Sequence, residues 1–262
     1  MIYYIVFLHH PMFIDLFDQR IKEAAELIHN SRYLVIFTGA GVSTESGIPD
    51  YRGPDGLWTR RDKGLPPPKV PKWSTVEPNQ AHMAIVELQN MGLMKFLISQ
   101  NVDNLHLKSG IKEELIAEFH GNMELMRCLQ CGKKIQKEGF WDEKKWGKAY
   151  QTSPKAKNQP KCPGCGGAIV SSIVNFGDPI PANELQFSFD HSKLADVFLV
   201  VGSSLTVTPA AYCPEYALQN HADLIIINNQ PTPFDSSATV LFHENAGKTL
   251  TRILEEIHRL RD

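Results

Sequence analysis

Several features that would place a chain outside the ordinary globular proteins are missing from these 262 residues. No run of about 18 apolar residues occurs, so the sequence predicts no transmembrane helix. The apolar start, residues 1–8, lacks a basic lead-in and a small-residue cleavage site, so we treat residues 1–11 as an N-terminal extension rather than a secretory signal. A strong net charge is also missing, because 27 Lys and Arg against 29 Asp and Glu give −2. We therefore expect no membrane partner and no direct binding of nucleic acid.

Cysteine is scarce, and its arrangement argues against a disulfide framework. Only five Cys occur, and four of them form two C-x-x-C pairs, Cys128/Cys131 and Cys162/Cys165. Glycines beside both pairs allow tight turns that each present two thiolates, and two such turns close a tetrahedron. This set predicts structural zinc in a reducing compartment, hence an intracellular, cytoplasmic protein with the nucleus as the alternative. Free thiols, a redox pair and an iron–sulfur cluster are weaker interpretations, and Cys213 is interpreted as buried-core filler.

Short apolar runs alternate with helical patterns along most of the chain. The runs are typical of strands buried on both faces, and they cover residues 33–37, 96–98, 115–117, 197–201, 224–227 and 240–242. Apolar residues at helical spacing predict helices over residues 14–29, 80–90, 209–220 and 246–260. This alternation predicts an α/β fold, a parallel sheet with helices on both faces.

Two stretches interrupt the alternation. Residues 46–76 are rich in Gly and Pro and predict a loop with little regular structure. Residues 126–167 contain the Cys pairs and a polar segment, which predicts an exposed hairpin or loop inside a small insert. The lysines around Trp141 and Trp146 suggest a solvated face of this insert.

A glycine-containing turn directly follows the first predicted strand. Gly39-Ala40-Gly41 allows a tight turn and a close approach of the backbone to a pyrophosphate. The third glycine of the usual fingerprint is missing, because Thr44 occupies its place, and no Gly-Lys-Ser/Thr sequence follows. The turn therefore favours a dinucleotide over a nucleoside triphosphate.

Polar residues follow other predicted strands. Gln100, Asn101 and Asp103 suit recognition of an amide and a sugar, while residues 202–204 and 228–230 offer small and amide side chains. Because ligands of open parallel sheets bind beyond the carboxyl ends of the strands, these turns predict one shared cleft. His120 stands out among ten histidines, because it lies between a strand-like run and a Gly turn.

Taken in order, these motifs closely resemble those of the sirtuin family of NAD-dependent protein deacylases. The matching stretches are residues 39–43, 47–53, 100–103, 119–122, 176–178 and 202–205, with the four paired Cys. Residues 53–59 resemble the branch of the vertebrate nuclear sirtuins of the six-and-seven type.

The resemblance implies a division into two domains. A Rossmann-like NAD-binding domain would comprise residues 12–45, 91–125 and 174–262. A small domain would combine a helical or loop module, residues 46–90, with a zinc-ribbon module, residues 126–173.

The resemblance also implies an activity, that of a protein-lysine deacylase acting on acetyl or longer acyl groups. NAD would be the co-substrate and an acyl-lysine protein or peptide the partner, with nicotinamide and O-acyl-ADP-ribose as products. His120 would be the general base, Asn101 and Asp103 would be the other catalytic residues, and zinc would take no chemical part.

By the same resemblance, several loops would contribute to the two binding sites. The NAD site would comprise Gly39, Ala40, Gly41, Thr44, Asp50, Tyr51, Arg52, Trp58, Gln100, Asn101, Asp103, His120, Gly202, Ser203, Ser204, Asn228, Gln230 and Ala246. The peptide would pair with a strand edge at residues 206–209 and contact Val174, Phe176, Gly177 and Thr206.

Some positions depart from the common family pattern. Asn104 stands where Gly is frequent, a mild change because Asn tolerates a left-handed backbone. Asn175 and Asp178 replace commoner residues near the acyl-lysine channel and leave the acyl preference open. Three other functions remain as alternatives: mono-ADP-ribosyl transfer to protein in the same cleft, a zinc ribbon that binds nucleic acid, and a hydride-transfer dehydrogenase. The near-neutral charge argues against the second, and the missing third glycine argues against the last.

Overall fold

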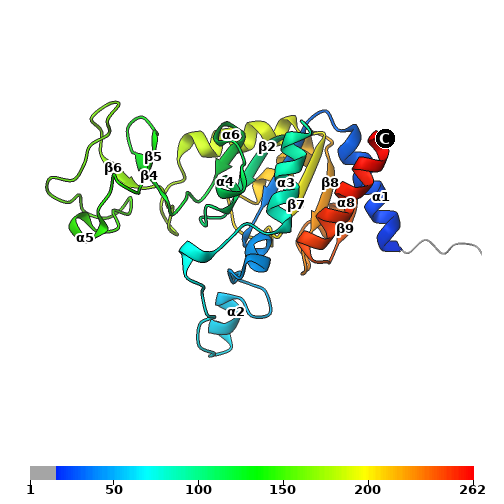
Figure 1. Cartoon of the computed structure of the whole chain (residues 1–262), viewed down its shortest axis with the longest axis horizontal. Coiled ribbons are helices and arrows are strands. Elements are labelled where there is room, and N and C mark those ends of the chain that lie inside the picture. The colour runs from blue at the N-terminus through cyan, green and yellow to red at the C-terminus, as the bar shows by residue number, and fades with distance from the viewer. Residues whose placement is uncertain (1–15) are drawn as a thin grey trace, which may run out of the picture.

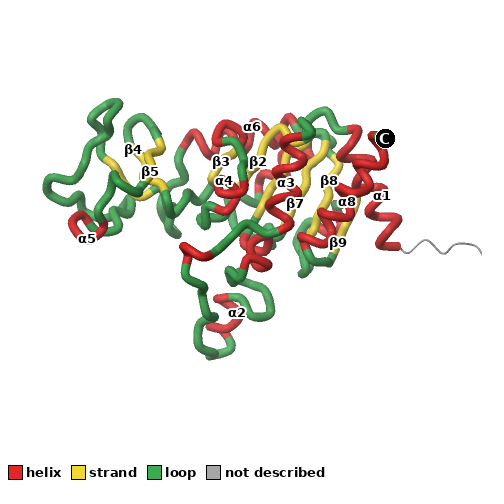
Figure 2. Tube along the Cα trace, in the orientation of Figure 1, coloured by secondary structure: helices red, strands yellow, loops and turns green. Residues whose placement is uncertain are grey.

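A computed structural model of the chain describes residues 16–262, so the extension predicted for residues 1–11 lies outside the described part. A six-stranded sheet with helices on both faces forms the main body, and a separate three-stranded sheet lies at the far end from α1 and α8 (Figure 1). A loop-rich excursion that carries α2 extends from the main body (Figure 2). None of the helices within residues 16–262 is long and apolar enough to cross a membrane.

The large sheet is entirely parallel, in the order β3-β2-β1-β7-β8-β9. Its strands are β1 Leu34–Thr38, β2 Met94–Ser99, β3 Ile116–Glu118, β7 Val197–Val201, β8 Asp223–Ile227 and β9 Val240–Phe242. Counted along the sheet this is the 3-2-1-4-5-6 order of the Rossmann fold. The order reverses between β1 and β7, which places a crevice beyond the carboxyl ends of these two strands.

Helices cover both faces of this sheet. One face carries α1 Leu16–Asn30, α3 Gln80–Asn90 and α8 Ala246–Arg261, and the other carries α6 Ala182–Leu194 and α7 Tyr212–Gln219. The side chains of β1 divide between them, because successive residues of a strand point to opposite faces. Leu34 and Ile36 join the first core, and Val35 and Phe37 join the second.

The insert forms a small antiparallel sheet in the order β5-β4-β6. Its elements are β4 Leu125–Cys128, β5 Lys134–Gln136, α5 Glu143–Trp146 and β6 Ile169–Ser171. We refer to residues 125–171 as the zinc module. The expectation of a solvated face is wrong for Trp141, which is 7% exposed, packs against Trp146 and donates from Nε1 to the Gly147 carbonyl over 2.8 Å. A module this small needs a large ring to fill its core.

The predicted strands end within two residues of the observed ones, and three differences stand out elsewhere. Helix α6 was not predicted, because its buried residues include Glu184, Ser188 and Ser192 and so give no apolar periodicity. Residues 206–209 do not form the predicted strand edge, because the chain turns there and the Ala211 N–H bonds back to the Val207 carbonyl. Helix α7 consequently begins at Tyr212 rather than at residue 209.

The segment between β1 and β2 contains more helix than the prediction of a loop. It carries α2 Leu57–Asp62 and a 3₁₀ turn at Trp73–Thr75. Another short helix, α4 Leu105–Ser109, lies outside this segment, after β2. Helix α3 packs against α8 in the large core, although the sequence-based division placed residues 46–90 in the small domain. The domain boundaries remain a prediction.

Candidate functional site

The ends of β1 and β7 meet where the strand order reverses. The Gly39 N–H donates to the Val201 carbonyl over 3.1 Å, and the Gly41 N–H donates to the Gly202 carbonyl over 2.8 Å. A Cβ on Gly41 would lie 2.7 Å from that carbonyl oxygen, and Gly202 has a left-handed φ of +64°. The glycines are therefore required by the contact between the two turns.

The turn after β1 continues as a 3₁₀ helix, Ala40–Ser46, at the mouth of this crevice. Ala40 is half-buried, and Thr44 is exposed with its hydroxyl bonded to the Gly41 carbonyl over 2.8 Å. Ser43 is fully buried and points toward the loop after β2.

Ser43 joins Asn101 and Asp103 in one hydrogen-bonded group. Its hydroxyl donates to Asp103 Oδ2 over 2.7 Å and accepts from Asn101 Nδ2 over 3.1 Å. The Leu105 N–H donates to Asp103 Oδ1 over 3.0 Å, and Asn104 has the left-handed φ of 66° that Asn tolerates. Burial raises the pKa of Asp103, although these hydrogen bonds oppose the shift. Ser43 is thus a site residue that the sequence analysis quoted only as part of a motif.

His120 follows β3 and faces the same region. Its Nδ1 lies 2.9 Å from the Gln100 carbonyl oxygen. Because a carbonyl can only accept, Nδ1 carries the proton and Nε2 of the neutral ring keeps its lone pair. Burial lowers the pKa of His120 and outweighs the opposing effect of the Gln100 bond. The ring is therefore neutral at physiological pH, with a free basic nitrogen.

The predicted residues after β7 bond to the turn after β2, whereas those after β8 bond to each other. Gln100 Nε2 donates to Ser203 Oγ over 2.8 Å, which links the β2 turn to the β7 turn, and the hydroxyls of Ser204 and Thr206 lie 3.0 Å apart. After β8, Asn228 Nδ2 donates to the Gln230 carbonyl over 2.7 Å. Ala246 opens α8 and is 8% exposed.

Two loops meet through aromatic side chains. The Trp58 ring lies 5.2 Å from that of Tyr51 and 5.8 Å from that of Phe176, and the Arg52 guanidinium lies 4.3 Å from the Trp58 ring centroid. Phe176 is nevertheless 80% exposed. The contact brings predicted NAD-site residues beside a predicted substrate residue.

Backbone and carboxylate bonds shape both of these loops. Asp50 Oδ1 accepts the Gly53 N–H over 2.8 Å, and a Cβ on Gly53 would collide with that carboxylate. The Val174 N–H donates to the His120 carbonyl over 2.9 Å, which joins the second loop to the His120 turn. Farther along, Gly177 has a left-handed φ of +86°, and the Asn175 amide donates to Asp178 Oδ2 over 3.2 Å.

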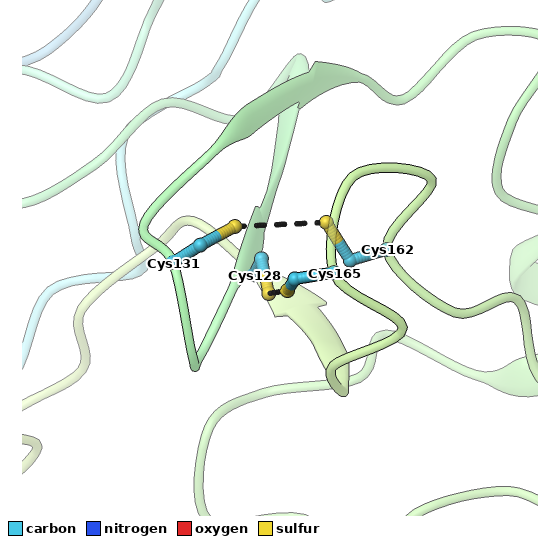
Figure 3. A group of neighbouring side chains, drawn as sticks. All are labelled: Cys128, Cys131, Cys162 and Cys165. Carbon is cyan, nitrogen blue, oxygen red and sulfur yellow. Dashed lines mark hydrogen bonds between the residues drawn. The ribbon is translucent and has the colours of Figure 1, made fainter.

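The four paired thiols lie in one cluster, as Figure 3 shows. All four sulfurs lie within 4.8 Å of one another, with 3.6 Å between Cys128 and Cys165 and 3.7 Å between Cys131 and Cys162. Zinc–sulfur bonds of about 2.3 Å in a tetrahedron require sulfurs about 3.8 Å apart, so the cluster fits a zinc ion. The Gly164 N–H bonds to the Cys162 sulfur and lowers the pKa of that thiol to about 6, whereas the Cys131 and Cys128 thiols outweigh a Gly167 N–H bond and raise the pKa of Cys165 to about 12. The thiols therefore share their protons as one group, and zinc binds them as thiolates. A set of four protein ligands leaves no open position and is structural.

Cys213 lies outside this cluster. It is fully buried in α7, and burial raises the pKa of its thiol to about 12. Its predicted place as core filler is confirmed.

Comparison with known proteins decides the family. The model of the family described as "Sir2 family" matches residues 39–69 and 67–209. This chain belongs to the Sir2 family, the sirtuins. The match spans the crevice turns, the His120 turn and the whole zinc module.

Three proteins that resemble this sirtuin match it over nearly their full length. A protein of Caldivirga maquilingensis named NAD-dependent protein deacetylase is 39% identical over 252 residues, which cover 90% of this chain and 93% of the relative. A solved structure described as "Structural Basis for the Mechanism and Regulation of Sir2 Enzymes" has a TM-score of 0.71 and 35% identity, and the match covers 93% of this chain and 100% of that one. Another, described as "Sir2-p53 peptide-NAD+", has a TM-score of 0.68 and 33% identity over 90% of this chain and 98% of that one.

Proposed function

We propose that this sirtuin is an NAD-dependent protein-lysine deacylase that transfers the acyl group of a modified lysine to ADP-ribose. The observation that carries the proposal is the His120 ring, whose Nδ1 lies 2.9 Å from the Gln100 carbonyl oxygen, a contact that favours the tautomer with a lone pair on Nε2. The activity in the name of the Caldivirga relative and the peptide and NAD+ of the solved Sir2 complex support the same reaction.

NAD supplies an activated sugar carbon, because its cationic nicotinamide is a good leaving group. The base that then takes a proton from a ribose hydroxyl must be neutral and must have a free nitrogen. His120 meets both conditions, and a general base of this kind contributes about 10²–10⁴-fold to the rate.

The residues that hold the nucleotide come from turns at one edge of the sheet. Asn101 and Asp103, oriented by Ser43, hold the ribose and the nicotinamide amide. The remaining members of the proposed NAD site are Gly39, Ala40, Gly41, Thr44, Asp50, Tyr51, Arg52, Trp58, Gln100, Gly202, Ser203, Ser204, Asn228, Gln230 and Ala246.

The acyl-lysine peptide binds beside Val174, Phe176, Gly177 and Thr206. Phe176 is exposed and contacts Trp58, so it is available to the peptide next to the nucleotide. The four thiols hold zinc, which takes no chemical part. A cluster of free thiols needs a reducing compartment, which supports an intracellular location.

The test is an incubation with acetylated peptide and NAD, followed by mass spectrometry of the products. We expect nicotinamide and acyl-ADP-ribose to form only when peptide is present. His120→Ala should lower turnover by about 10²–10⁴-fold while zinc content and circular dichroism stay unchanged. His258→Ala, at an exposed position of α8, is the matched control and should remain fully active.

Two results would count against the proposal: a fully active His120→Ala variant, or nicotinamide release that is independent of peptide. Label from NAD that becomes fixed on protein would favour mono-ADP-ribosyl transfer instead. A panel of acetyl and longer acyl peptides resolves the acyl preference that Asn175 and Asp178 leave open.

A further inference from the structure

Lys134 reaches out of the zinc module into the main body. It opens β5, three residues after the zinc ligand Cys131, and the neighbouring Lys133 carbonyl accepts the N–H of Cys128 over 3.0 Å. Its Nζ lies 3.0 Å from Glu118 Oε2 at the end of β3 and 2.9 Å from Glu184 Oε1 in α6. One side chain thus joins a zinc-binding turn to strand β3 of the large sheet and to helix α6.

The two carboxylates depend on this ammonium. Their side chains are 5% and 6% exposed, and the Glu118 N–H donates to Glu184 Oε2 over 2.8 Å. Burial by itself lowers the pKa of Lys134, but both carboxylates act against burial and hold the pKa above its usual value. Without Lys134, two buried carboxylates would face each other with no cation between them, which destabilises this arrangement of the two groups.

Glu118 passes this constraint to the His120 turn. Its other oxygen, Oε1, accepts from Asn122 Nδ2 over 2.5 Å, and the same nitrogen lies 2.8 Å from Asn104 Oδ1. His120 lies between Glu118 and Asn122, and Asn104 lies next to Asp103. The chain of contacts from Lys134 therefore reaches the turn that carries His120 and the turn that carries Asp103.

The turn is also pinned from the opposite side. Ser172 accepts the Asn122 N–H over 2.9 Å and donates to the Asn122 carbonyl over 2.6 Å. Gly121 has a φ of +82°, and a Cβ there would lie 2.0 Å from the Ser172 carbonyl oxygen. A turn fixed this closely has one position, and small shifts of a catalytic group can cost about 10²-fold in rate.

We propose that Lys134 is a positioning residue that couples the zinc module to the His120 turn. It lies outside the proposed nucleotide and peptide sites, and it acts through Glu118 and Asn122. This inference rests on the proposed function for its kinetic consequence. Its structural consequence, the fixed position of residues 118–122, is independent of any activity.

The kinetic experiment separates the two halves of the reaction. Exchange of labelled nicotinamide into NAD reports the first half, which does not use the base, and acyl-ADP-ribose formation reports both halves. Lys134→Met should lower product formation by about 10- to 100-fold while exchange stays near the wild-type rate. Lys134→Arg should restore most of the product formation, and Lys133→Met, at an exposed neighbour, should match the wild type.

The structural experiment uses hydrogen–deuterium exchange of the zinc-loaded protein without substrates. Lys134→Met should raise deuterium uptake in a peptide covering residues 118–123, and Lys133→Met should not. Removal of zinc from the wild type should raise the same uptake, and its removal from Lys134→Met should add little. Unchanged uptake in Lys134→Met, or an equal loss of exchange and product formation, would overturn the inference.

A second variant covers the case in which Lys134→Met does not fold. The double variant Lys134→Met, Glu184→Gln removes one carboxylate together with the ammonium, so no pair of like charges remains. It should retain zinc and still show the selective loss of product formation. If the wild type and Lys133→Met lack both exchange and product formation, the proposed function fails while the uptake result still tests the coupling.

Discussion

The two sheets of this chain are stabilised in different ways. Every residue of β1 and β7 is buried, and rings such as Phe37, Phe198 and Phe242 fill the cores on the two faces of the large sheet. In the zinc module, by contrast, the residues of β5 are at most half-buried, and two of its six core residues are the zinc ligands Cys128 and Cys162. The large sheet is held by apolar burial, whereas the small one has its metal site inside its core.

This difference assigns separate tasks to the two regions. Most of the proposed nucleotide contacts lie on turns at the ends of strands of the large sheet. The zinc module lies on the β3 side of that sheet, next to the strand that precedes His120 (Figure 2). Its stability can therefore affect the His120 turn without any ligand contact.

The largest effect that separates the two regions should come from removing zinc. Chelation, or Cys128→Ser, should unfold residues 125–171, because zinc binding in small modules is worth about 10–16 kcal/mol. The large sheet should stay folded. Tryptophan fluorescence reports mainly on the parts outside the large sheet, because two of the four Trp lie in the zinc module and two in the 46–76 segment. Far-ultraviolet circular dichroism reports mainly on the helices that cover the large sheet. We expect a large change in fluorescence and a small change in dichroism.

Cys213→Ser is the matched control for this experiment. It exchanges a thiol for a hydroxyl in the buried core of α7, outside the zinc cluster, so zinc content should remain at the wild-type level. Equal loss of both signals on chelation would show that the two regions unfold as one unit, which would contradict their separate stabilisation.

A smaller effect should come from matched truncations in the two cores. Trp141→Ala and Phe198→Ala each remove a buried ring, a change that typically costs about 3–5 kcal/mol. In the zinc module this loss should appear as weaker zinc retention against a competing chelator, with the melting temperature of the large sheet unchanged. Phe198→Ala should lower that melting temperature and leave zinc retention unchanged. If Trp141→Ala lowered the main melting temperature as much as Phe198→Ala does, the two cores would not be independent.

The same division explains what the sequence could predict. The buried strands are visible as apolar runs, and the zinc cluster as two spaced C-x-x-C pairs, because each signal is local. Helix α6 was missed because Glu184 is buried against Lys134, a partner about fifty residues away that no local pattern reveals. The burial of Trp141 was not predicted for the same reason. Its lysine neighbours are adjacent in the sequence, whereas core residues that surround it, such as Met126 and Ile169, are distant in the sequence.

The site shows the same limit. The strand-end turns were predictable from composition, whereas the role of Ser43 depends on side chains that lie 58 and 60 residues away. The glycines at residues 39 and 41 were predicted to approach a pyrophosphate, and the structure shows that they first approach the turn at Gly202. Such reasons appear only when the two turns are placed together in space.

The smallest effect concerns acid and belongs to the large core alone. His82 in α3 is fully buried beside His106, and burial lowers its pKa to about 4. Between that value and 6.5 the unfolded state binds a proton that the folded state does not, so stability falls as the pH falls through this range. The full shift corresponds to about 3 kcal/mol.

His82→Gln should reduce this acid-dependent loss of stability, measured as the urea midpoint of the dichroism signal at pH 7 and pH 4.5. Zinc ligands also gain protons in acid, so fluorescence should change equally in both proteins. An undiminished loss in His82→Gln would assign the acid sensitivity of the large core to other groups.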